Sequence, residues 1–193
     1  MTTYDENWAI AEEAKRKWMA ENGMFREDDE HSSCGVGLVV AIDGTKSRKV
    51  VENGIAALKA VWHRGAVDAD GKTGDGAGIH LQIPVRFFYD QIKRTGHEPR
   101  LNELVAVGQV FLPRTNFGAQ ETCRTIVETE VLRMGYYIYG WRHVPVKVEC
   151  LGEKANATRP EIEQILISNS KGSDQETFER ELYVIRRRIE KAV

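Results

Sequence analysis

The chain has 193 residues, of which 41% are hydrophobic and 29% charged, and its formal net charge is -2 at pH 7. This balance is typical of one soluble globular domain with its own hydrophobic core, and it excludes disorder on a large scale. Lysine and arginine are scattered among acidic residues, so nucleic acid is not expected as a partner. The longest apolar run, residues 35–42, is too short to cross a bilayer, and no signal-peptide pattern opens the chain. We therefore expect a cytoplasmic protein without a membrane partner.

The first predicted element is a helix over residues 3–22. Thr3 and Glu6 form a capping-box pattern, and Gly23 stands where a helix C-cap belongs. The apolar face of this helix consists of Ile10, Ala14 and Trp18. The acidic run over residues 26–33 has no periodicity, which predicts an exposed linker or a cleavage segment.

Two apolar runs predict core strands on either side of a helix. Residues 34–42 are rich in β-branched residues and end at the turn pair Asp43–Gly44, and residues 79–83 form the second run. Between them, Ser47 opens a predicted helix that should pack on the sheet. The apolar stripe of this helix is Val51, Ile55, Leu58 and Trp62. A glycine-rich loop over residues 65–78 follows.

The second half of the chain mixes strands with amphipathic helices. Strands are predicted over residues 104–112, 136–148 and 165–168. Pro84 starts a short helix in the favoured first position, Asn116 caps a longer one, and a third begins at Ser173. The apolar stripes are Cys123, Ile126, Val127, Val131 and Met134 in the second helix, and Phe178, Leu182, Ile185 and Ile189 in the third. The absence of strict strand–helix alternation indicates a layered α/β (α+β) sandwich rather than a doubly wound sheet.

Cys34 is the first candidate for chemistry. It stands where a polar segment turns into a predicted strand, and Gly35 and Gly37 permit close backbone approach beside its thiol. The alternative interpretation is a small buried hydrophobic residue, and the spacing alone leaves both open. Because the cysteines are odd in number and unevenly spaced, we expect reduced thiols rather than a disulfide framework or a metal knuckle. They are Cys34, Cys123 and Cys150.

Three motifs follow one another in a combination that is rarely produced by chance. They are CGVG at Cys34–Gly37, HRGA at His63–Ala66 and DADGKTGDGAG at Asp68–Gly78. Together they resemble the start of the large (alpha) subunit in the bacterial glutamate synthase family, a class II glutamine amidotransferase with an N-terminal-nucleophile (Ntn) hydrolase fold. The likeness covers nearly all of residues 26–193. It implies an αββα sandwich of antiparallel sheets, incomplete in this chain.

The resemblance also implies a division into residues 1–33, a propeptide-like segment, and residues 34–193, the N-terminal part of the amidotransferase domain. Cleavage before Cys34 would free an α-amine with a pKa of roughly 7.7–8.0, which can take the thiol proton. The thiolate would attack the side-chain amide of L-glutamine and release ammonia and then glutamate. In the complete enzyme this ammonia is passed to 2-oxoglutarate to make glutamate.

Further site residues come from the same resemblance. Arg64 matches the family arginine beside the nucleophile, where its cation favours thiolate. The alternative for Arg64 is a helix-end arginine paired with Asp68, Asp70 or the helix C-terminus, and His63 is expected to be structural. The loop residues Gly74, Asp75 and Gly76 lack a nucleotide-binding pattern, so we expect them to shape the glutamine pocket.

The sequence lacks two segments that class II amidotransferases need. These are an RFST-type segment, whose arginine grips the glutamine carboxylate, and an HNGE-type segment, which supplies the oxyanion hole. Since losing one oxyanion donor costs ~10²–10³ in rate, the isolated chain should be a poor or inactive glutaminase. The expected partners are the remaining glutamate synthase domains or subunits, with FMN and an iron–sulfur cluster bound there and no cofactor in this chain. The alternative function is a noncatalytic amidotransferase-like interaction or regulatory module.

Overall fold

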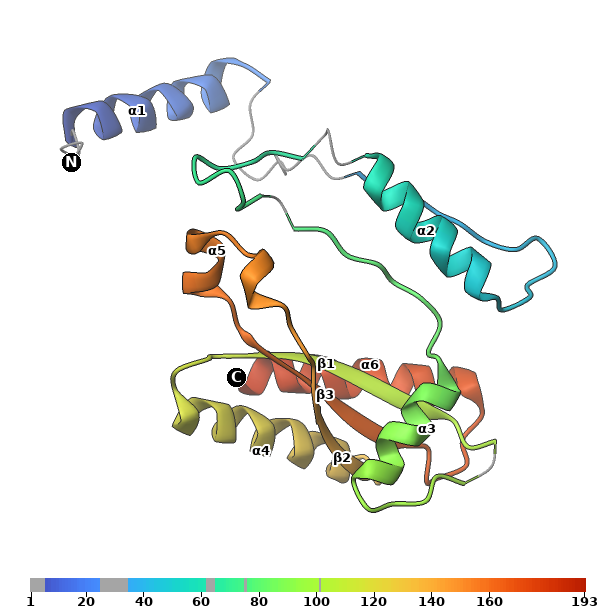
Figure 1. The fold of residues 1–193 in the computed structure, drawn as a ribbon. Helices are drawn as coiled ribbons and strands as arrows, with labels where there is room; N and C mark the ends of the chain where they lie inside the picture. The colour runs from blue at the N-terminus through green and yellow to red at the C-terminus, as the bar shows by residue number, and fades with distance from the viewer. Residues whose placement is uncertain (1–5, 25–34, 62–64, 75, 101) are drawn as a thin grey trace. The chain divides into compact units, whose positions relative to one another are not determined.

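The computed structural model, drawn in Figure 1, describes residues 6–24, 35–61, 65–74, 76–100 and 102–193. The chain divides into two compact units, Met1–Leu38 and Val39–Val193. Within the described ranges, no helix combines the length and the apolar character needed to cross a bilayer.

The first unit contains α1 (Glu6–Asn22), drawn in blue in Figure 1. This helix confirms the prediction, and it ends where the Gly23 N–H donates to the Met19 carbonyl at 2.9 Å. The side chains of Ile10 and Trp18 are exposed, so the predicted apolar face has no cover among the described residues. Thr3 and residues 26–33 lie outside the described part of the chain.

The two predicted core strands before residue 84 are not formed in the described residues. Residues 35–42 and 79–83 have no strand partner there. Their apolar side chains are exposed, as Ile42 and Leu81 illustrate. A strand exists only when a neighbour takes up its backbone N–H and C=O groups, and an apolar pattern does not say where that neighbour comes from. Both strand predictions are wrong for these residues.

The turn and helix between these segments are confirmed. Gly44 has a φ of 72°, which favours glycine, and its N–H donates to the Ala41 carbonyl at 3.0 Å. Helix α2 (Arg48–Ala60) begins after Ser47, whose Oγ accepts from the Val50 N–H at 3.3 Å. No residue of α2 is buried, so it lacks the face that packing on the sheet would require. Trp62, the last member of its predicted stripe, lies outside the described residues.

The second unit is built around a three-stranded antiparallel sheet with the order β1–β3–β2. The strands are β1 (Val105–Leu112), β2 (Tyr137–His143) and β3 (Glu161–Ser168). All three were predicted, but β3 starts earlier than residue 165 because its polar side chains find partners. Gln164 Nε2 donates to Gln109 Oε1 at 2.9 Å, and Arg124 donates to both oxygens of Glu163 at 2.9 and 2.6 Å. The strand is therefore satisfied along its whole length.

Strand β2 is shorter than predicted and carries a bulge. It ends at His143, close before Pro145, which lacks the N–H that a continuing strand would need. Its register shifts between Ile138 and Gly140, where Gly140 has a φ of 132°. Because the bulge interrupts the alternation of side chains, Trp141 lies on the same face as Ile138.

Helices cover both faces of this sheet (Figure 1). Ile165 and Ile167 of β3 pack with α4 (Phe117–Arg133) and α6 (Gln175–Ala192), whereas Leu166 packs with α3 (Val85–Arg94). This alternation is the strand periodicity that the sequence predicted. The predicted stripes of α4 and α6 supply the core on their face through Val127, Val131, Phe178 and Ile185.

The starts of these helices are close to those predicted. Asn116 Oδ1 caps α4 by accepting from the Ala119 N–H at 3.0 Å. Pro84 is the N-cap of α3 rather than its first helical residue, and Asp174 rather than Ser173 is the N-cap of α6. The mixture of helices with a small antiparallel sheet is consistent with an incomplete α/β Ntn-hydrolase-like domain.

The segment that connects β2 to β3 contains two short helices that were not predicted. They are a 3₁₀ helix (Val148–Cys150) and α5 (Glu153–Thr158). Cys150 is exposed and Cys123 is half-buried, and both are free thiols as expected. Helix α5 contacts the glycine-rich loop through Lys154.

Candidate active site

The predicted catalytic residues, Cys34 and Arg64, fall outside the part of the chain that the structure describes. The same holds for His63, which was expected to be structural, and for Asp75 of the glycine-rich loop. The glycines that follow the cysteine are described, and a Cβ atom added at Gly35 or Gly37 would meet no atom of the described residues within 4 Å. The roles assigned to these residues therefore stay predictions, whereas the loop after Arg64 has a defined shape.

The glycine-rich loop folds back on itself. Val67 and Gly74 form an antiparallel bridge, and within it the Asp68 N–H donates to the Thr73 carbonyl at 2.6 Å. The Gly71 N–H closes the turn on the Asp68 carbonyl at 2.9 Å, and Gly71 has a φ of 69°. Its glycine is thus required by backbone conformation.

The Asp70 carboxylate organises the tip of this loop. It accepts hydrogen bonds from the Lys72 N–H at 2.9 Å, from the Thr73 N–H at 2.7 Å and from the Thr73 hydroxyl. These donors stabilise the charged form, so the pKa of Asp70 is lowered to about 2, with the Thr73 hydroxyl as the largest cause. The carboxylate is therefore ionised throughout the neutral pH range.

Gly74 is required by contact rather than by conformation. A Cβ atom at this position would lie 2.8 Å from the Ala66 carbonyl oxygen, which belongs to the opposite side of the loop. Because that atom is backbone, any side chain would force the loop open. A Cβ atom at Gly76, in contrast, would meet no described atom within 4 Å. The place of this loop beside a glutamine pocket stays a prediction.

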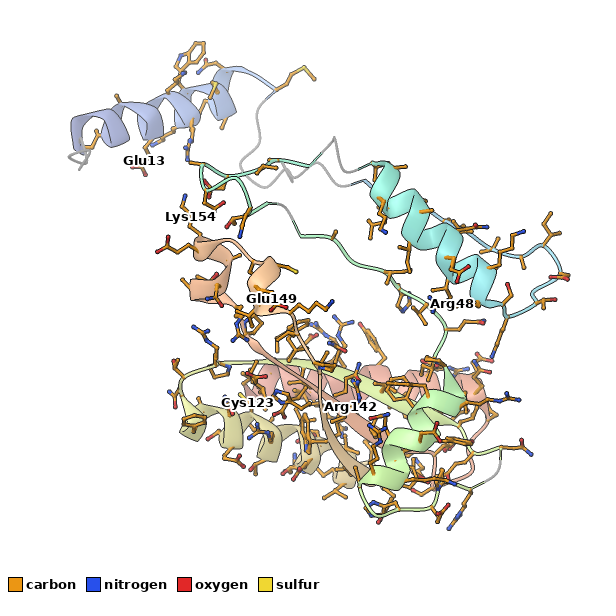
Figure 2. All side chains as sticks on the ribbon, viewed as in Figure 1. Glu13, Arg48, Cys123, Arg142, Glu149 and Lys154 are labelled. Carbon is orange, nitrogen blue, oxygen red and sulfur yellow. The ribbon has the colours of Figure 1, made fainter. Side chains whose placement is uncertain are left out.

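Lys154 of α5 binds the loop from a distant part of the sequence. Its Nζ lies 2.9 Å from Asp68 Oδ1 and 2.8 Å from Asp68 Oδ2, and Figure 2 shows the side chain projecting from α5 toward the loop. The Lys154 ammonium lowers the pKa of Asp68, with a smaller contribution from the Ala69 N–H. The same contact raises the pKa of Lys154. Asp68 is thus paired with Lys154. The pairing of Arg64 that the sequence offered as an alternative lies outside the described residues.

Sequence reasoning missed Lys154 and its neighbour Gly152 altogether. Their separation from the loop, 86 residues between Asp68 and Lys154, leaves no periodic signal. The sequence offered no signal for Gly152 either, because its burial directly before a short helix without a side-chain cap is visible only in the structure.

Comparison with known proteins identifies the family. The profile of the class-II glutamine amidotransferases matches residues 34–193. The chain belongs to this family. The match begins at Cys34 and includes Arg64 and the whole loop, whereas α1 precedes it. The motifs CGVG, HRGA and DADGKTGDGAG therefore lie within an amidotransferase domain.

Among class-II amidotransferases, the chain is similar to several glutamate synthases. It is 66% identical over 169 residues to the N-terminal region of the glutamate synthase (NADPH) large chain of Azospirillum brasilense, covering 88% of this chain and 11% of that protein. It is 35% identical over 173 residues to the corresponding large chain of Bacillus subtilis (strain 168), covering 87% and 11%. It is 36% identical over 164 residues to ferredoxin-dependent glutamate synthase 1 of Arabidopsis thaliana, covering 85% and 10%. The chain thus spans about a tenth of the length of these relatives.

Proposed function

We propose that this amidotransferase domain hydrolyses L-glutamine to glutamate and ammonia, as the glutaminase part of a glutamate synthase, with Cys34 as its nucleophile. The observation that carries the proposal is the family match, which starts at Cys34 and continues to residue 193. The 66% identity to a glutamate synthase large chain supports the choice of this enzyme among class-II amidotransferases.

The proposed chemistry needs a free α-amine on Cys34. An amide nitrogen has no usable lone pair, but an α-amine with a pKa of roughly 7.7–8.0 can take the thiol proton near neutral pH. The sulfur then attacks the amide carbon of glutamine, and the C–N bond breaks as the amine returns the proton to the leaving ammonia. Water hydrolyses the resulting thioester, which releases glutamate and restores the thiol.

Residues 1–33 act in this proposal as a propeptide whose removal creates the base. Support comes from α1, where no described side chain from Ile10 to Met24 is buried. A helix without a buried face adds little to the packing of the domain, so its loss should leave the sheet intact. In this account Arg64 favours the thiolate of Cys34 through its positive charge.

The partners follow from the same proposal. Ammonia passes to 2-oxoglutarate in the remaining domains of the synthase, where FMN and an iron–sulfur cluster supply reducing chemistry. The residues of this chain provide the thiol, the amine and the loop. The alternative of a noncatalytic interaction or regulatory module predicts no turnover of glutamine.

The test uses an extended polypeptide, in which this chain continues into segments that supply the glutamine clamp and the oxyanion hole. Cys34→Ser should lower glutamine hydrolysis by about 10⁴-fold or more, because removal of a nucleophile disables the whole catalytic unit. The matched control is Cys150→Ser, which replaces an exposed free thiol and should leave the rate unchanged. Equal rates for the wild type and Cys34→Ser would refute the nucleophile assignment, and no turnover in any variant would favour the noncatalytic module.

Processing is tested by intact mass and N-terminal sequencing of the same protein. Active enzyme should begin at Cys34. A fully active population that still begins at Met1 would contradict the role of the α-amine as base.

A further inference from the structure

The start of α5 touches the glycine-rich loop through a second contact besides the Lys154 pair. A Cβ atom added at Gly152 would lie 2.6 Å from the Thr73 backbone nitrogen, and closer still to Thr73 Oγ1 and Asp70 Oδ2. These atoms form the hydrogen-bonded tip of the loop. The backbone at Gly152 therefore packs directly on that tip, where no side chain would fit.

Backbone conformation does not explain this glycine. Gly152 has a φ of -71° and a ψ of 164°, which any residue can adopt. The requirement for glycine arises from the approach of the loop alone. A side chain here would have to displace Thr73, whose backbone nitrogen is held by Asp70.

Lys154 adds a charged contact at the base of the same loop. Its ammonium bridges both oxygens of Asp68, and Asp68 also holds the loop through its backbone N–H and C=O groups. The exposed fractions of the two side chains are 66% for Lys154 and 35% for Asp68, so solvent screens the attraction between their charges. The pair therefore adds little to the stability of the fold, and its main effect is to orient the loop against α5. Gly152 at the tip and Lys154 at the base thus contact two separate points of one loop.

We propose that Gly152 and Lys154 are positioning residues for glutamine hydrolysis, which hold the loop after Arg64 in its working shape. The inference rests on the proposed function, in which this loop lies beside the glutamine pocket. Arg64 directly precedes the loop, and Val67, at its base, is bridged to Gly74. A displacement of the loop would therefore be transmitted to Arg64 and to Asp75. Displacements of about 1 Å in an active site can lower rates by ~10²-fold.

The first test alters the charge at Lys154 in the extended polypeptide. Lys154→Met should lower kcat for glutamine about 10-fold, while Lys154→Arg, which keeps a cation and a fork of donors, should retain most of the activity. A charge swap that combines Asp68→Lys with Lys154→Asp should recover part of the loss. The matched control is Lys93→Met, which removes another surface pair, Lys93 to Glu98 at 3.6 Å, and should leave kcat unchanged.

The second test alters sterics at Gly152. Gly152→Ala should lower kcat between about 10-fold and 100-fold, since the Cβ atom must displace backbone. Gly118→Ala is the control at the start of another helix, where a Cβ atom would meet only Asn116 Oδ1 at 3.6 Å. Its rate should equal that of the wild type.

Hydrogen exchange separates a failure of this inference from a failure of the proposed function, because it needs no turnover. In the 193-residue chain, Lys154→Met and Gly152→Ala should speed exchange of the Asp68 and Gly71 amides by about 10-fold, with unchanged exchange in β3. Faster exchange in the two variants, beside a wild type that does not hydrolyse glutamine, would support the loop contact and refute the proposed glutaminase function. Unchanged exchange and unchanged kcat in both variants, beside a wild type that hydrolyses glutamine, would overturn the positioning role.

Discussion

Two regions of the second unit contrast in how they use apolar residues. Residues 39–83 and residues 105–193 both contain apolar runs with strand-like or helical spacing. In the later region, the strands pair and their side chains are buried between α3 on one face and α4 and α6 on the other. In the earlier region, Val40, Ile42 and Leu81 are exposed. An apolar pattern therefore makes a segment able to pack, but its side chains are buried only when another strand or helix lies against them.

The glycine-rich loop belongs to the earlier region but behaves differently from its surroundings. It is held by polar contacts, through Asp70 within the loop and through Lys154 of α5. Such contacts need no apolar cover, so the loop can keep its shape where the predicted strands around it have no partners. The following predictions test this division, from the largest expected effect to the smallest.

Core truncation should separate the two regions most clearly. Leu166 is 0% exposed in the central strand, so Leu166→Ala should lower the free energy of unfolding by about 3 kcal/mol. Leu81 is 42% exposed, and Leu81→Ala should cost less than about 1 kcal/mol. Urea denaturation of the 193-residue chain measures both. Equal losses would show that residues 79–83 are packed after all.

The ion pair between α4 and β3 should be the next largest contribution. Arg124 and Glu163 are 19% and 10% exposed, and removing the cation with Arg124→Met should cost about 2 kcal/mol. Among the described residues, the Glu163 carboxylate would then keep only the weaker contact with His143 Nδ1 at 3.9 Å. Arg180→Met is the control, because its pair with Glu176 is 73% and 79% exposed. We expect this control to cost less than about 0.5 kcal/mol.

The pH dependence of the same pair has a defined sign. Arg124 lowers the pKa of Glu163 below its ordinary value of 4.5. The stabilisation is therefore present above about pH 4.5 and is lost as the pH falls through the lowered pKa of Glu163. Glu163→Gln should reduce the loss of unfolding free energy at acid pH, as measured by urea titrations between pH 3 and pH 7. The same loss in the variant and the wild type would show that another group controls it.

Helix caps offer a smaller test in both regions. Asn116→Ala should lower the free energy of unfolding by about 1 kcal/mol, because α4 is packed on the sheet and its fraying is coupled to the core. Ser47→Ala removes the equivalent cap from α2, which has no buried residue. We expect the second variant to increase amide exchange within α2 without moving the urea midpoint. If both variants shift the urea midpoint, α2 is coupled to the core in the same way as α4, which would contradict the contrast between the two regions.

The tip of the loop, which the Asp70 carboxylate holds, should respond to acid. Because the pKa of Asp70 is lowered to about 2, its hydrogen bonds to Lys72 and Thr73 are fully present above about pH 4 and are lost as the pH falls toward 2. Exchange of the Thr73 amide, corrected for its intrinsic pH dependence, should accelerate in that window. Asp70→Asn should show fast exchange at every pH. A transition near neutral pH would contradict this assignment.

Local signals in the sequence predicted much of the fold. The caps at Ser47 and Asn116 and the turn at Gly44 depend on neighbouring residues, so they are visible in a short window. The strands β1 and β2 were predicted because β-branched and aromatic residues are concentrated in them. The bulge at Gly140 was not foreseen, since it depends on pairing with β3.

Features that depend on distant partners were missed. The start of β3 contains Glu163 and Gln164, which look unsuited to a central strand until Arg124 and Gln109 are beside them. The same reason hid the contact of Lys154 with Asp68. Cys34 and Arg64 were proposed from motifs rather than from spacing, and they lie outside the described residues.

The most direct test of the proposed function is labelling with diazo-oxo-norleucine, a glutamine analogue whose reactive carbon forms a thioether with the attacking cysteine. Cys150 is an exposed free thiol and serves as an internal control, because a nonspecific reagent such as iodoacetamide should modify it. In the extended, processed polypeptide, peptide mass mapping should find the glutamine analogue on Cys34 and none on Cys150. Labelling of Cys150 with Cys34 unmodified would contradict the assignment of Cys34 as the nucleophile.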